Sequence, residues 1–206
     1  IDYKKKNLLN LGIHWIAGNS YIEEKIKTSQ IYSSQFHKIS KIYNTYQQNK
    51  FSNKEILDFK NKNNLNKYDL LLLFSSLKLS DKRKGIEELK KCLNFYSKTS
   101  NKKKKIAIIS IGKEKNIKLN NDIIEHIHFD YIKNQKELFL LFASCHIFLN
   151  LSKYDFGPIL CEIAFHNDLF ILSSNVGIAR EIIENNLNGF IYNNDKELEK
   201  KFMLII

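Results

Sequence analysis

Short apolar runs alternate with amphipathic stretches along most of the chain. The apolar runs are bounded by polar residues, as in strands buried on both faces of a sheet. The amphipathic stretches repeat their apolar residues every three or four positions, as helices do. We expect strands at 69–76, 105–112, 125–132, 146–152, 169–174 and 188–192, and helices at 84–98, 134–145, 158–166, 177–186 and from 195 onward.

Strands separated by helical stretches predict βαβ units and hence the α/β class. Right-handed crossovers then give a Rossmann-like parallel sheet with helices on both faces. The apolar residues of segment 125–132 alternate with polar ones, so we expect this strand to lie nearer the edge of the sheet. Ligands of such sheets bind outside the carboxyl ends of the strands. This rule directs attention to the loops after Ser76, Gly112, Tyr131, Ser152 and Ser174.

The first 65 residues show a different pattern. Strands at 12–18 and 38–44 flank a helix at about 20–33, and a polar helix at 51–65 precedes the first strong strand. We place a domain boundary near residue 45, so that 1–44 form the end of a preceding domain and 45–206 the Rossmann-like domain. Because the chain lacks an initiating Met and ends in an apolar segment, we expect it to be part of a longer protein, truncated at both ends.

Bulk composition narrows the class of protein. The chain has 206 residues, of which 43% are hydrophobic and 27% charged, as in a globular protein. Its apolar runs fall short of the ~18 residues that a membrane span needs. Cys92, Cys145 and Cys161 lie in apolar segments without metal-ligand spacing, which predicts buried free thiols in a reducing compartment.

The formal charge of +11 points to an anionic partner. Nucleic acid, an anionic membrane surface and a phosphorylated substrate all fit such a charge. Nucleic-acid sites usually combine arginine with exposed aromatic residues on one element, whereas Arg83 and Arg180 are the chain's arginines and lysines supply the rest. The lysine cluster at 101–105 precedes a strand and fits a solvated loop. The sequence therefore argues against nucleic acid.

The stretch SKYDFGPILCE, residues 152–162, follows a strand and opens a helix. A helix N-terminus offers unpaired amides and partial positive charge to an anion such as phosphate. Gly157 lets a ligand approach the backbone, and Pro158 is favoured at the first helical position. Glu162 is placed to accept hydrogen bonds from sugar hydroxyls, with Asp155 at the mouth. The alternative is that Asp155 is an ordinary N-cap and Glu162 an exposed helix residue.

A second candidate is SDKRKGIEEL, residues 80–89, where Lys84 and Gly85 begin a helix after a strand and its loop. A cation beside a helix N-terminus is unfavourable for the helix unless an anion lies between them. The alternative is a solvent-facing basic loop.

The order of these motifs resembles the nucleotide-sugar-binding half of retaining glycosyltransferases of the GT-B fold, specifically glycosyltransferase family 4. LLLLFSSLKLSDKRKGIEEL resembles the first strand of the second domain, its loop and the Lys-Gly of the next helix. IHFDYIKNQKELFLLFASCHIFLNLS resembles the elements that lead into the active-site loop. The stretch from SKYDFG to NGFIY resembles the paired-acid motif, the next strand and a Gly-containing turn. KISKIYNTYQQNKF resembles the interdomain segment, and HWIAGNSYIEEKI the serine-containing segment that closes the first domain.

The resemblance implies a donor site. Lys84 would contact the diphosphate, Glu162 would hold the ribose, and Asp155 would be the first acid of the pair, beside the donor sugar. Lys84 and Asp155 would be the catalytic residues. The remaining donor-binding positions would be the loop residues Phe156, Gly157, Ile159 and Leu160, the residues Tyr131 and Ile132 bordering the base, and Ser75, Ser76, Lys78 and Arg83 after the first strand.

The sequence departs from the family pattern at several places. Asp155 and Glu162 enclose six residues where the family usually has seven, and Ser75-Ser76 replaces a Gly-Arg pair, so that Lys78 or Arg83 would have to substitute for the arginine. Residues 165–170 replace a Gly-x-Pro turn, and one glycine precedes residue 178 where two are common. A non-catalytic nucleotide-sugar or polyanion binder, and a sugar-nucleotide epimerase or phosphorylase, are therefore the alternatives.

The expected function is retaining transfer of a hexose-type sugar from a nucleotide-diphosphate sugar to a glycan or lipid-linked acceptor, in surface polysaccharide biosynthesis. No metal or other cofactor is expected, since Lys84 and a helix N-terminus would carry the charge of the leaving group and the sequence has no Asp-x-Asp cluster. We expect a cytoplasmic protein whose basic charge permits contact with the inner face of an anionic membrane, and we expect the fragment alone to be inactive.

Overall fold

The computed structural model describes residues 7–8, 11–33, 37–45, 50–78, 80–99, 104–114, 124–157 and 159–206. Its strands are β1 (His14–Ala17), β2 (Lys38–Lys41), β3 (Leu70–Ser75), β4 (Ile106–Ile111), β5 (Ile124–Phe129), β6 (Ile147–Asn150), β7 (Phe170–Ser174) and β8 (Gly189–Tyr192). Its helices are α2 (Ser20–Lys27), α3 (Asn53–Lys62), α4 (Ile86–Thr99), α5 (Gln135–Ser144), α6 (Ile159–His166), α7 (Ala179–Ile182) and α8 (Asp195–Ile205), and a 3₁₀ turn, η1, covers Lys82–Lys84.

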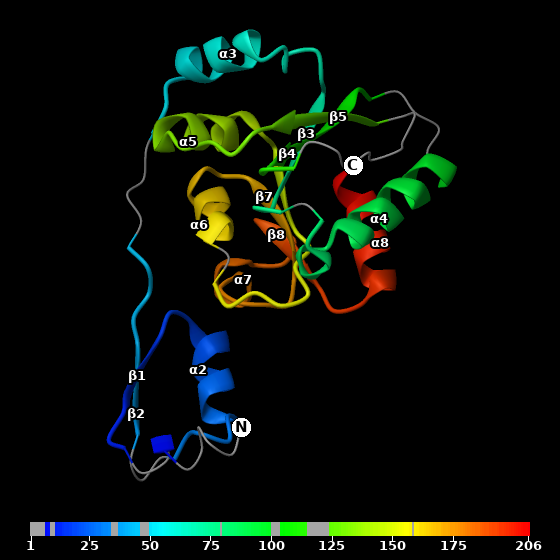
Figure 1. The fold of residues 1–206 in the computed structure, drawn as a ribbon. Helices are drawn as coiled ribbons and strands as arrows, with labels where there is room; N and C mark the ends of the chain where they lie inside the picture. The colour runs from blue at the N-terminus through cyan, green and yellow to red at the C-terminus, as the bar shows by residue number, and fades with distance from the viewer. Residues whose placement is uncertain are drawn as a thin grey trace.

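Six strands form one parallel sheet in the order β5-β4-β3-β6-β7-β8 (Figure 1). β3 lies at its centre, where Leu72 pairs with both Ile108 of β4 and Ile147 of β6. β5 lies at the edge, as its alternating pattern predicts. The predicted α/β class and the parallel sheet are therefore confirmed.

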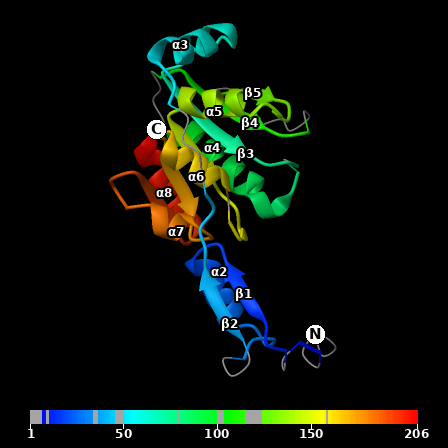
Figure 2. The same ribbon diagram turned by 90° about the vertical axis from the view of Figure 1, so that its left-hand side faces the viewer.

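Helices cover both faces of this sheet, and each face has its own core. Successive side chains of β3 point in opposite directions: Leu71 and Leu73 pack into one core, Leu72 and Phe74 into the other. The first core includes buried residues of α3, α5 and α6, and the second includes buried residues of α4 and α8 (Figures 1 and 2). Burial on both faces explains why the central strands are apolar throughout.

The N-terminal part forms a smaller unit below the main sheet in Figure 1. β1 and β2 pair in parallel, with His14 opposite Lys38, and α2 packs beside them. Helix α3 packs against α5 of the main unit (Figure 2). The domain boundary near residue 45 remains a prediction.

Three predicted helices are shorter than expected, and the helix expected over 51–65 is α3, Asn53–Lys62. The helix expected over 20–33 ends at Lys27, because the Thr28 hydroxyl donates to the carbonyls of Glu24 and Lys25 and competes with continuation of the helix. The helix expected over 177–186 is limited to α7, since the Asn188 side chain binds the backbone of Ile182 and Glu184 and turns the chain toward β8.

The three cysteines are buried and free, as predicted. Burial raises the pKa of the Cys92 thiol to about 12, which keeps it protonated and unreactive at neutral pH.

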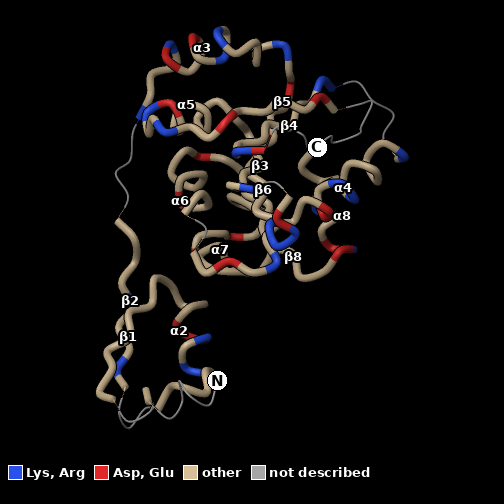
Figure 3. The backbone as a smooth tube through the Cα atoms, in the orientation of Figure 1, with Lys and Arg blue, Asp and Glu red and all other residues tan. Residues whose placement is uncertain are grey.

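Acidic and basic residues are mixed on α3 and α5 (Figure 3). Among the described residues, the helices lack the combination of length and hydrophobicity that crossing a bilayer requires.

Candidate functional site

The two candidate motifs meet at the carboxyl edge of the sheet. The loop after β3 and the loop after β6 lie together because these strands are neighbours. Lys84 Nζ lies 2.5 Å from Asp155 Oδ2, although 71 residues separate them in the chain. The Lys153 amide also donates a hydrogen bond of 2.7 Å to the carbonyl of Arg83. The structure thus brings together the lysine and the acid that the sequence singled out.

Gly85 makes this approach possible. It has a φ of +84°, in the left-handed region that favours glycine, and it ends the 3₁₀ turn that carries Lys84. A Cβ at this position would lie 2.1 Å from the Leu151 carbonyl oxygen. Helix α4 consequently begins at Ile86, two residues later than predicted, and Lys84 stands in the turn before it.

Asp155 holds its own loop as well as Lys84. Its Oδ1 accepts a hydrogen bond of 3.3 Å from the Gly157 amide, while its Oδ2 pairs with Lys84. The Asp155 side chain is 15% exposed and that of Lys84 31%, so the pair is screened less than a surface ion pair. Asp155 therefore organises the turn before α6 rather than serving as an ordinary N-cap. Pro158, predicted to begin the helix, lies outside the described residues.

Glu162 is half-buried on α6, which corrects the alternative of an exposed helix residue. Burial raises the pKa of its carboxyl, against the opposing effects of a hydrogen bond with the Asn44 side chain and the charge of His166. Asn44 follows β2, so the segment that resembles an interdomain connection reaches this acid. Sequence reasoning did not single out Asn44.

The residues expected at the base lie at the end of β5. Tyr131 is 52% exposed, with Lys113 Nζ 5.7 Å from the centre of its ring. Ile132 is partly buried and packs against the core. An exposed aromatic ring beside a cation at the carboxyl edge is compatible with a stacked base.

The loop after β3 uses several predicted residues for its own structure. Ser75 ends the strand, and Ser76 is buried, with its hydroxyl donating to the Lys78 carbonyl at 2.7 Å. Arg83 donates from Nε and Nη2 to the two oxygens of Asp81, at 3.1 and 2.7 Å. The Arg83 guanidinium is thus already paired, and the side chain of Lys78 is exposed.

The loop before α6 and the first residue of α6 present apolar side chains outward. Phe156 is 73% exposed and Ile159 53%, whereas Leu160 is partly buried against the core. Gly157 would carry a Cβ 3.6 Å from Nδ2 of Asn19, so the N-terminal unit comes close to this loop.

Sequence reasoning also missed a set of contacts between α2 and the main unit. Asn19 Nδ2 donates to the Phe156 carbonyl at 2.8 Å. Glu181 accepts from the Ser20 amide and the Tyr43 hydroxyl, each at 2.5 Å. Arg180 pairs with Glu24 at 2.9 Å. These contacts hold the start of α2 beside the loop of residues 151–157 that contains Asp155, which we call the acid loop.

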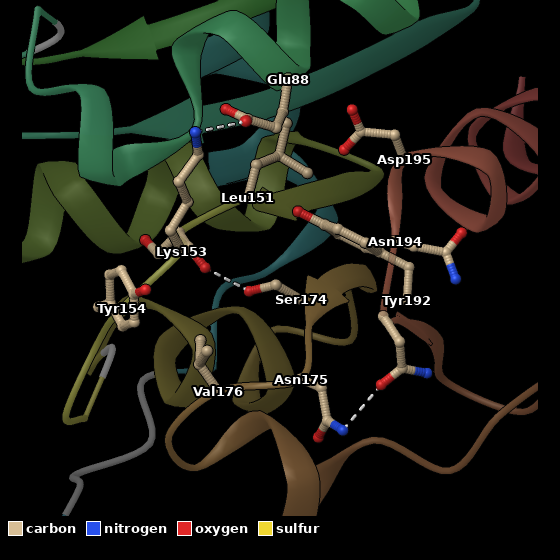
Figure 4. A pocket seen from close by; sticks show the side chains of 12 residues that line it. Glu88, Leu151, Lys153, Tyr154, Ser174, Asn175, Val176, Tyr192, Asn194 and Asp195 are labelled. Carbon is tan, nitrogen blue, oxygen red and sulfur yellow. Dashed lines mark hydrogen bonds and ion pairs between the residues drawn. The ribbon is translucent and has the colours of Figure 1, made fainter.

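A polar pocket lies next to this site, on the side of the sheet that α4 and α8 cover (Figure 4). Its volume is about 380 Å³, and it is lined by residues at the carboxyl ends of β6, β7 and β8, with Glu88 of α4 and Asp195 of α8. Lys153 Nζ pairs with the buried Glu88 at 2.9 Å, and the Ser174 hydroxyl donates to the Ser152 carbonyl. Within the described part of the chain, no three His, Cys, Asp or Glu residues are grouped as metal ligands would be.

Comparisons with known proteins agree with this architecture. HepE of Anabaena in complex with UDP is 16% identical with a TM-score of 0.67, over 92% of this chain and 52% of that one. Sucrose-phosphate synthase from Thermosynechococcus elongatus is 15% identical with a TM-score of 0.69, over 98% and 51%. WaaG, a glycosyltransferase involved in lipopolysaccharide biosynthesis, is 16% identical with a TM-score of 0.62, over 91% and 51%.

At these identities the likeness shows the fold, and the chain spans about half of the length of each of these structures. No curated protein matched the sequence. Residues 55–206 match the family model of the glycosyl transferases group 1, which covers most of the chain. The chain therefore belongs to the glycosyl transferases group 1 family.

Proposed function

We propose that the chain is the donor-binding part of a retaining glycosyltransferase that moves a hexose-type sugar from a nucleotide-diphosphate sugar to a glycan or lipid-linked acceptor. The observation that carries this proposal is the meeting of Lys84 with the loop that opens α6, at 2.5 Å from Asp155. A cation beside a helix N-terminus suits a diphosphate. HepE, which shares the fold, was crystallised with UDP and with UDP-glucose.

Lys84 and the first amides of α6 would stabilise the leaving diphosphate. Retaining transfer passes through an oxocarbenium-like state in which the leaving group gains negative charge. A fixed cation aimed at that charge stabilises the transition state more than the ground state and so raises the rate. Losing one such group typically costs about 3 kcal/mol of barrier. Because these groups carry the charge, the proposed reaction needs no metal ion.

The other acid and the base-binding residues would fix the donor's orientation. Glu162 would accept hydrogen bonds from the ribose hydroxyls, most strongly in its ionised form. Tyr131 would lie against the base, with Lys113 on the same ring. The donor sugar would then lie beside Asp155, where the loop of Phe156 and Gly157 faces the N-terminal unit.

The acceptor and the setting are proposed from charge and likeness. The formal charge of +11 favours an anionic partner, such as the diphosphate of a lipid-linked acceptor or the surface of an anionic membrane. WaaG is described as involved in lipopolysaccharide biosynthesis. We therefore place the reaction in surface polysaccharide assembly, at the cytoplasmic face of a membrane.

A non-catalytic nucleotide-sugar binder is the second candidate. Three cations of the two loops are already paired with carboxylates: Arg83 with Asp81, Lys84 with Asp155 and Lys153 with Glu88. Such pairing lowers the attraction for a diphosphate, and the spacing between Asp155 and Glu162 is one residue shorter than the family usually has.

Calorimetric titration of the chain with UDP and UDP-glucose tests the donor site, with generic RNA titrated in parallel. We expect Lys84→Ala and Glu162→Ala each to weaken nucleotide binding at least tenfold. Lys82→Ala removes the same charge two residues away and serves as the matched control. Unchanged affinity in both site variants, or equal affinity for RNA, would overturn the proposal. NMR of the anomeric proton in the product of the intact protein then separates retention from inversion, and the absence of any transfer favours the binder.

A further inference from the structure

Asn19 is a buried polar side chain that belongs to the N-terminal unit but contacts the acid loop. Only 2% of it is exposed. Its Oδ1 accepts from the Ile22 amide at 2.9 Å, which caps α2. Its Nδ2 donates to the carbonyl of Phe156 at 2.8 Å. The single side chain therefore satisfies the end of one helix and a loop 137 residues away.

The bond to Phe156 fixes the middle of the loop that carries the candidate site. Asp155, just before Phe156, pairs with Lys84. Gly157, just after it, donates its amide to Asp155. The Phe156 side chain is exposed and gives the loop little anchorage of its own. Asn19 thus supports the loop from the N-terminal unit.

The neighbouring contacts hold Asn19 in place. Glu181 accepts from the Ser20 amide and from the Tyr43 hydroxyl, and the Arg180 guanidinium lies 4.8 Å from the centre of the Tyr21 ring. The start of α2 is therefore anchored to α7 at several points, and the bond to Phe156 is part of that interface.

We propose that Asn19 is a positioning residue, which sets the acid loop for the donor diphosphate and makes its position depend on the N-terminal unit. This inference rests on the proposed donor site and extends it to a residue outside the donor-binding unit. Asn19 acts through the Phe156 carbonyl, so its removal loosens Asp155 and the Gly157 amide without removing any group that touches the donor.

Asn19→Asp separates this role from helix capping. Asp has the same shape and is an equally good N-cap, so α2 keeps its cap. It cannot donate to Phe156, and its carboxylate oxygen would face the Phe156 carbonyl as a second acceptor. Asn19→Ser also keeps the cap but is too short to reach the loop, while Asn19→Ala loses both bonds. Asn134→Asp makes the same change at the N-cap of α5, where the side chain accepts from the Glu137 amide, and is the matched control.

UDP titration and hydrogen–deuterium exchange test the proposal together. We expect Asn19→Asp and Asn19→Ser to weaken UDP binding about fivefold, the loss of about 1 kcal/mol expected for one hydrogen bond. Amides of residues 153–157 should exchange faster while those of α2 stay protected, which loss of α2 structure would not produce. Asn19→Ala should weaken binding equally and also lower the melting temperature by about 2–4 °C. Asn134→Asp should change neither readout.

The outcomes distinguish this inference from the proposed function. If the unaltered chain binds UDP and Lys84→Ala weakens it, but Asn19→Asp leaves both affinity and loop exchange unchanged, the positioning role is wrong and the donor site stands. If α2 and the acid loop lose protection together in Asn19→Asp, the residue is merely structural and the positioning role is again wrong. If the unaltered chain binds no UDP, both proposals fail.

Discussion

The ion pair between Lys84 and Asp155 leads to opposite predictions for its two members. Lys84 would attract a bound diphosphate, whereas the Asp155 carboxylate, 2.5 Å from the same ammonium group, would repel it and compete for the lysine. We therefore expect Lys84→Ala to weaken UDP binding and Asp155→Asn to strengthen it, even though Asp155 belongs to the proposed catalytic pair.

The magnitudes depend on the exposure of the pair. Two unit charges 4 Å apart interact by about 1 kcal/mol in water and about 4 kcal/mol at an effective dielectric constant near 20. With side chains 31% and 15% exposed, Lys84 and Asp155 lie between these limits. We expect Lys84→Ala to weaken UDP binding by about 2 kcal/mol, or about 30-fold. We expect Asp155→Asn to strengthen UDP binding by about 1 kcal/mol, or about fivefold; this gain is smaller because water hydrates the freed lysine.

A double-mutant cycle checks both predicted changes: calorimetry measures the UDP affinity of the two single variants and of the double variant. Asp58→Asn, on the exposed surface of α3, makes the same charge change away from the site and controls for net charge. Urea unfolding of the same set gives the stability coupling, which we expect to be about 1–2 kcal/mol for a partly buried pair. Weaker UDP binding by Asp155→Asn, or equal affinity in all variants, would refute the competition between carboxylate and diphosphate.

Two further predictions concern Gly85 and Glu162. Gly85→Ala should lower the free energy of unfolding in urea by more than about 2 kcal/mol, because it combines a left-handed φ with a Cβ 2.1 Å from a backbone oxygen. Gly18→Ala is the control, since a Cβ there meets nothing within 4 Å. Equal stability of the two variants would contradict the close approach at Gly85. UDP-glucose affinity should fall on acidification with a midpoint above the ordinary pKa of glutamate, since burial raises the pKa of Glu162 and its ionised form accepts the stronger hydrogen bonds from the ribose. UDP-glucose is the probe because its phosphates, unlike the terminal phosphate of UDP, do not titrate in this pH range. The neutral form of Glu162 is favoured in the fold, so its protonation should raise stability as the pH falls through the raised pKa. Glu162→Gln should abolish this pH dependence, and a midpoint at the ordinary pKa in titrations over pH 4–8 would argue against the assignment.

Much of the fold was predictable because it depends on local patterns. Continuous apolar runs such as 70–75 and 106–111 can only be buried on both faces, and their alternation with amphipathic stretches dictates a parallel sheet with helices on each side. The rule that ligands bind at carboxyl ends then selected the loops of Lys84 and Asp155. Their approach within 2.5 Å is a result of β3 and β6 being neighbours.

The remaining features depend on contacts that no local pattern encodes. Asn19 meets Phe156 across 137 residues and Tyr43 meets Glu181 across 138, so neither was apparent from spacing. Gly85 looked like half of a weak Lys-Gly motif, and only the Leu151 carbonyl beside it explains why a side chain is excluded. The helix expected over 177–186 was overestimated because Asn188 binds the backbone in competition with helical hydrogen bonds.

The central place of β3 has a consequence for synthesis. β3 pairs on one side with β4, the next strand in the chain, but on the other side with β6, whose residues Ile147–Leu149 face Leu72–Phe74. As the chain leaves the ribosome, that second edge of an apolar strand stays open until β6 has emerged. Open, hydrophobic edges recruit other chains, so stalling between residues 112 and 146 exposes the nascent protein to aggregation. Chaperone demand should be greatest in that window.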